Sequence, residues 1–189
     1  MRVPRSIIAG LLLAACTSQP EPEAEALNLH ETMKEIDADA VRLWEISNAA
    51  IDDVGGIDAS AMSDADWTAL AKAAENLSGD ATRLAQADAI LVAAAGVKID
   101  GVGEPGASSA ADVQGFVDAD PANLKEMAQA LAVHAADLQK AAEAQDAERA
   151  GPLVAQLDAV CESCHVRFWY PQYELPPGYP HPDEILGKR

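Results

Sequence analysis

The stretch LVAQLDAVCESCHVRF, residues 153–168, decides the fold of this chain and contains its most distinctive chemistry. Its apolar side chains recur at steps of three and four, which places them on one face of an α-helix. They are Leu153, Leu157, Val160, Cys164 and Phe168. The periodicity predicts a helix that packs against other helices through this face.

Two thiols and an imidazole share the last turns of this predicted helix. Cys161 and Cys164 are three residues apart, a spacing that puts both sulfurs on one helical face, and His165 follows directly. Cys-x-x-Cys-His is the attachment sequence of a c-type haem, in which an imidazole serves as an iron ligand. We therefore predict one haem c per chain, with thioether bonds from Cys161 and Cys164 and with His165 as the proximal iron ligand.

Two other uses of the motif fit less well. A structural zinc site needs four ligands, and the one further cysteine, Cys16, lies in a predicted export signal. A thioredoxin-like pair belongs to a chain that alternates strands and helices, and no strand pattern surrounds this motif. An incidental match in a structural helix stays open as an alternative.

Residues 1–15 have the pattern of a signal peptide: Arg2 and Arg5 precede an apolar run that is too short to span a membrane. The sequence LAAC at residues 13–16 resembles the bacterial lipobox, which implies lipidation of Cys16. We expect a periplasmic protein anchored to the membrane by lipid, with Thr17 favouring the outer membrane, and residues 16–26 as a flexible tether. An ordinary cleaved signal with an incidental cysteine is the alternative.

The chain is strongly acidic. It contains 31 acidic and 13 basic residues, and removal of residues 1–15 takes two arginines away and leaves a formal charge of −20. This charge disfavours binding to nucleic acid. It suits a redox partner with a basic docking surface, and equally a solvated surface that keeps an exported protein soluble.

Three further helices are predicted, over residues 27–52, 63–96 and 120–146. Ser63 and Asp66 resemble a capping box at the start of the second of these helices, and Asp120 followed by Pro121 predicts the start of the third. The helix with the motif begins between residues 146 and 152, and Pro152 is expected in its first turn. Glycines throughout residues 96–120 predict a loop there.

These patterns predict an all-α fold, an antiparallel four-helix bundle over residues 27–170 with covalently attached haem near the C-terminus. Residues 171–189 are rich in proline and tyrosine and predict an extended tail that packs back on the bundle.

A haem motif in the final helix of such a bundle resembles the class II c-type cytochromes, the cytochrome c prime family. That family commonly continues the motif as Cys-x-x-Cys-His-x-x-Phe/Tyr-Arg. Phe168 matches this extension, whereas Trp169 replaces the arginine. A contact that the family makes through that arginine is therefore in doubt for this chain, and Arg167 points another way on a helix.

The resemblance implies that the first helix lines the opposite face of the haem. Thr32-Met33-Lys34-Glu35-Ile36 is similar to the stretch that supplies the sixth iron ligand in low-spin members, which implies Met33 as that ligand. His30, one turn earlier, is the rival. Five-coordinate members leave the iron open to NO or CO, and Met33 then serves only as a core residue.

Three functions follow from this sequence. The first is electron transfer through His/Met-ligated haem iron, the second is binding of NO or CO at an open iron, and the third is a membrane-tethered helical bundle without haem. The sequence contains no nucleophile elbow, phosphate loop or paired catalytic carboxylate motif, so we do not expect an enzyme. A homodimer is possible, since dimers are common in the family.

Overall fold

The computed structural model describes residues 26–52, 55–101 and 108–174, together with residues 177, 179, 181 and 184. The described chain is mostly helical, which confirms the predicted all-α class. The predicted signal peptide and lipidated Cys16 lie outside the described residues.

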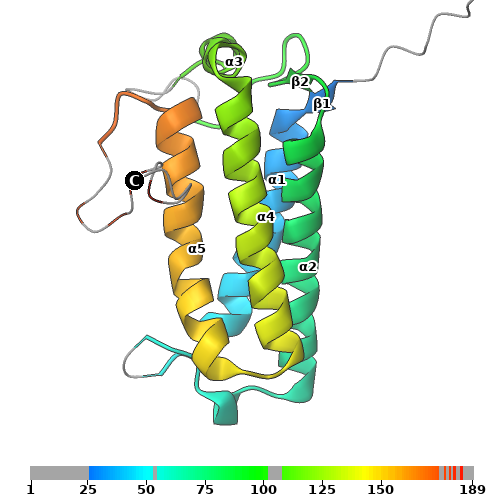
Figure 1. Cartoon of the computed structure of the whole chain (residues 1–189), viewed down its shortest axis with the longest axis vertical. Coiled ribbons are helices and arrows are strands. Elements are labelled where there is room, and N and C mark those ends of the chain that lie inside the picture. The colour runs from blue at the N-terminus through cyan, green and yellow to red at the C-terminus, as the bar shows by residue number, and fades with distance from the viewer. Residues whose placement is uncertain are drawn as a thin grey trace, which may run out of the picture.

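Four long helices lie side by side along the longest axis of the molecule (Figure 1). They are α1 (Leu29–Asn48), α2 (Asp64–Gln86), α4 (Pro121–Glu143) and α5 (Ala147–Phe168). α2 packs against α1 and α4, and α5 packs against α4 and α1. The short α3 (Ala110–Ala119) lies at the end of the molecule where α1 begins and α5 finishes (Figure 1).

Polar side chains fix where the helices begin. The Asn28 side chain accepts a hydrogen bond from the Glu31 amide at the start of α1. Ser63 and Asp66 form the predicted capping box of α2. Asp120 caps α4, whose first residue is a proline, in the position where its missing N–H costs no hydrogen bond.

Two predicted helices extend too far. The first ends at Asn48 rather than at residue 52, and the second ends at Gln86 rather than near Gly96. After α2 the chain turns extended and forms β2 (Ile90–Leu91), which pairs in parallel with β1 (Leu27–Asn28). The apolar spacing of α2 continues into Ile90 and Leu91. These two residues are nevertheless extended, because their backbones pair with β1 just before α1.

The prediction of a loop throughout residues 96–120 is wrong, because α3 occupies its second half. Ser109 and Asp112 form a capping box there, and Val113 and Val117 are buried. Gly115 lies inside α3 with open space where a side chain would stand. Glycine in a helix costs about 1 kcal/mol relative to alanine. α3 tolerates this cost because the capping box and the two buried valines stabilise the helix.

Pro152 lies in the second turn of α5, not in the first turn as predicted. The residue before it, Gly151, is buried against the turn that follows α1. A Cβ at Gly151 would stand 3.2 Å from the Ile57 amide nitrogen and 3.3 Å from the Gly56 Cα. This close approach of two backbones requires glycine and holds the start of α5 against the segment after α1.

The core consists of two apolar clusters, one toward each end of the helices. The larger cluster includes the fully buried Leu43, Leu70, Leu77, Leu138 and Leu157. The smaller lies near α3 and includes Leu29, Val113, Leu124 and Phe168. Met33 packs against both clusters, so it marks the level at which they meet. No helix within the described ranges is long and apolar enough to cross a membrane.

Candidate functional site

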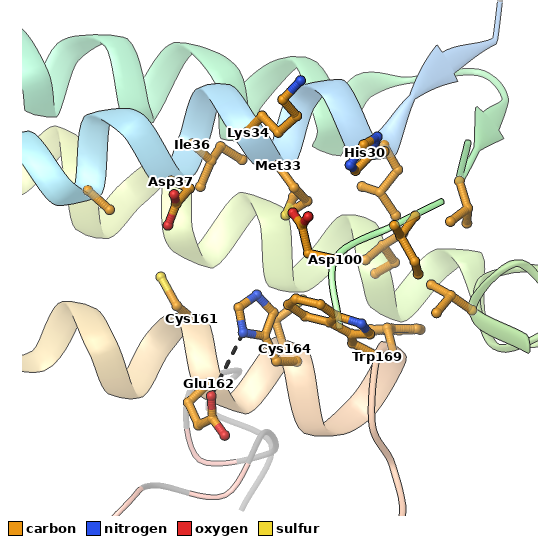
Figure 2. Close-up of a pocket in the computed structure, with 18 of the residues that line it drawn as sticks. His30, Met33, Lys34, Ile36, Asp37, Asp100, Cys161, Glu162, Cys164 and Trp169 are labelled. Atoms are coloured by element: carbon orange, nitrogen blue, oxygen red, sulfur yellow. Dashed lines mark ion pairs between the residues drawn. The ribbon is translucent and has the colours of Figure 1, made fainter. Parts of the chain in front are cut away.

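A cavity of about 470 Å³ lies between α1 and α5, at the level of Met33. Most of its lining is apolar, and its volume falls in the range of sites that bind cofactors. Figure 2 shows Met33 and Ile36 on the α1 side and Cys161 and Cys164 on the α5 side. Val92 and Ile99, from the segment after β2, and Val113 of α3 line the cavity at the end near α3.

The three motif side chains all line this cavity, as the helical spacing predicts. Cys161 and Cys164 are free thiols. Burial raises the pKa of each thiol to about 12, and the nearby Asp158 carboxylate adds to the shift at Cys161. Both sulfurs are therefore protonated thiols at neutral pH.

His165 is held from several sides at the C-terminal end of α5. The Trp169 ring meets it edge-on, with ring centroids 5.1 Å apart. The amides of Trp169 and Tyr170 both donate to the His165 carbonyl, at 2.7 and 3.0 Å. Burial lowers the pKa of the imidazole, although the Glu162 carboxylate opposes the shift. The ring is therefore neutral at pH 7, the form that binds metals.

Met33 and His30 both line the opposite wall. Met33 is partly buried and lies at the centre of the α1 side (Figure 2). His30 lies nearer β1, with 14% of its side chain exposed. Its Nδ1 is buried without a hydrogen bond, and the nearest carboxylate oxygen, Glu31 Oε1, stands 3.5 Å away. Both proposed iron ligands of α1 thus face the same space as the motif.

Basic side chains are scarce around the cavity. Lys34 lines it but is exposed and pairs with Glu31 at 3.3 Å. Arg42 does not line it and pairs with a neighbouring glutamate. Arg167 pairs with Asp120 at 2.8 Å, so it points away from the site, as its helical position predicts.

A further histidine and a tryptophan of the helices have structural roles away from the cavity. His134 Nε2 lies 2.7 Å from the Leu153 carbonyl oxygen; because a carbonyl only accepts, this nitrogen donates and ties α4 to α5. Trp67 is buried in the core away from the cavity, whereas Trp44 and Trp169 line it.

Four carboxylates that the sequence analysis did not single out also line the cavity. They are Asp37, Asp100, Asp158 and Glu162. Asp37 follows Met33 by one helical turn and Glu162 lies between the motif cysteines, so helical spacing could have found both. Asp100 comes from the segment after β2, whose path no local pattern predicts.

The lining fits the predicted haem. Two thiols and an imidazole come from one wall, a thioether sulfur faces them from the other, and apolar side chains form most of the remaining lining. The buried His30 Nδ1 adds an unsatisfied polar atom on the same wall as the thioether. Among the residues that the structure describes, no three His, Cys, Asp or Glu side chains converge as a site for a bare metal ion.

Comparison with known proteins returns no match: no family model, curated protein or solved structure is significantly similar to this chain.

Proposed function

We propose that this chain is an exported c-type cytochrome that carries single electrons. Cys161 and Cys164 hold the haem covalently, His165 binds the iron from α5, and Met33 binds it from α1. One observation carries the proposal: the attachment motif and Met33 face each other across one apolar cavity, although they lie more than a hundred residues apart in the sequence.

The haem supplies an iron that changes its charge by one electron. The chain determines how easily that change occurs. Ligands fixed on two packed helices keep the same coordination in both oxidation states, which lowers the reorganisation that accompanies electron transfer. The thioether of Met33 favours the reduced state and raises the potential. Ile36 and the other apolar lining residues would limit the access of water to a bound iron.

The resemblance to class II c-type cytochromes supports this assignment. We interpret α1, α2, α4 and α5 as the antiparallel four-helix bundle of that class, with the motif in the last helix. The proposal includes a periplasmic location with a lipid anchor at Cys16 and a redox partner with a basic docking surface, which the carboxylates around the cavity suit. A homodimer remains compatible with it.

Binding of NO or CO is the second candidate function. It is supported by Ile36, which lies on the α1 wall beside Met33 and gives an apolar distal face whenever Met33 packs without binding iron. Electron transfer is favoured because the Met33 side chain reaches the cavity between both core clusters.

Exposure of the reduced protein to CO separates the two functions. We expect the optical spectrum of the ferrous protein to stay unchanged under CO at neutral pH, because His165 and Met33 would both be bound to the iron and leave no position for CO. A reversible one-electron couple in a potentiometric titration is expected in the same sample. Rapid formation of a carbonyl complex by the unaltered protein would instead establish the open site.

A further inference from the structure

Glu162 has a place that the motif alone does not explain. It lines the cavity beside His165, and its Oε2 lies 3.8 Å from the His165 Nδ1 (dashed line in Figure 2). The Glu162 side chain is 28% exposed, so most of it is removed from water. The carboxylate therefore stands next to the ring nitrogen that remains free when the other nitrogen binds iron.

A tyrosine holds this carboxylate. The Tyr170 hydroxyl donates to the same Oε2 at 2.6 Å. Burial raises the pKa of this hydroxyl, and the hydrogen bond to Glu162 adds to the shift, so Tyr170 keeps its proton. Tyr170 is itself fixed over His165 by its backbone hydrogen bond to the His165 carbonyl and by edge contact of the two rings, whose centroids are 6.0 Å apart.

We propose that Glu162, held by Tyr170, is a positioning residue that accepts a hydrogen bond from the His165 Nδ1–H. This inference rests on the proposed function, because iron at Nε2 fixes the remaining ring proton on Nδ1 and makes that nitrogen a donor. When the 3.8 Å between the Glu162 Oε2 and the His165 Nδ1 shortens to hydrogen-bond distance, the hydrogen bond orients the His165 ring toward the cavity.

The consequence is a stronger iron ligand. A carboxylate acceptor draws the Nδ1 proton toward itself and makes the imidazole more basic, which stabilises ferric iron relative to ferrous iron. Glu162 thus opposes the rise in potential that Met33 causes, and the two residues on opposite walls set the potential together.

The test compares two charge-neutral variants of the haem-loaded protein. Glu162→Gln removes the charge next to His165. Asp158→Asn removes the same charge from a carboxylate that lines the same cavity but accepts from Tyr179. We expect Glu162→Gln to shift the one-electron equilibrium toward the reduced state about tenfold, or about 59 mV, and Asp158→Asn to shift it much less.

A second measurement reads the iron–histidine bond directly. In ferrous protein with Met33→Ala, resonance Raman spectroscopy reports the iron–histidine stretch, and we expect Glu162→Gln to lower its frequency while Asp158→Asn leaves it in place. Equal potential shifts in the two variants, with an unmoved stretch, would overturn the positioning role alone. Absence of haem from the unaltered protein would overturn the proposed function as well.

Discussion

A variant that carries both Cys161→Ser and Cys164→Ser contains no covalently bound haem. The hydroxyl group of serine does not form the thioether that a thiol forms with a vinyl group, and both thiols line the same wall of the cavity. We expect the unaltered protein to retain a haem peroxidase stain after denaturing electrophoresis and the double variant to lose it completely.

Ser163→Ala is the matched control for this experiment. Ser163 stands between the two cysteines and is fully buried, but its hydroxyl donates to the Val160 carbonyl within α5 and does not line the cavity. The control should keep the haem stain. A stain that persists in the double cysteine variant would contradict covalent attachment through this motif.

We expect Met33→Leu to convert the ferric haem from low spin to high spin. Leucine nearly preserves the side-chain volume, so the helices stay packed, but it offers no sulfur to the iron. We expect the sulfur-to-iron absorption band to disappear, the EPR spectrum to become high-spin, and the ferrous variant to bind CO. These changes are expected together, because the proposed function assigns the sixth position to Met33 alone.

The same substitution at Met127 controls for loss of a methionine from the core. Met127 is 3% exposed, belongs to the smaller core cluster and does not line the cavity. Met127→Leu should leave the ferric spectrum low-spin. If Met33→Leu also leaves it low-spin, the sixth ligand is another residue, and His30, on the same wall, is the next to be replaced.

The sequence was sufficient to predict the parts of the fold that depend on helical period and on caps. The apolar stripe of α5 put the motif on an inward face, and helical spacing in α1 put Met33 on an inward face, because one face of each helix must be buried. That the two would face each other was implied only by the resemblance to the class II c-type cytochromes. The capping box of Ser63 and Asp66 and the Asp120-Pro121 pair predicted where α2 and α4 begin.

The parts that were missed depend on long-range contacts. Ile90 pairs with Leu27, more than sixty residues earlier, and this pairing ended α2 sooner than its apolar pattern predicted. Gly151 packs closely against Gly56 and Ile57 in the segment after α1, a contact that no local pattern shows. Asp100 reaches the cavity because the chain after β2 folds back over the end of the helices, and no local pattern predicts that path. Periodicity describes single helices and carries no information on which distant segments meet.

The central claim is that this chain carries haem bound covalently, and the intact mass of the denatured protein tests it most directly. The full chain is expressed with a bacterial haem-attachment system, extracted, denatured and measured by mass spectrometry. The account predicts a polypeptide that is heavier by the mass of one haem, lost in the Cys161→Ser, Cys164→Ser double variant. A polypeptide without that added mass, from cells that load another c-type cytochrome in the same experiment, would contradict it.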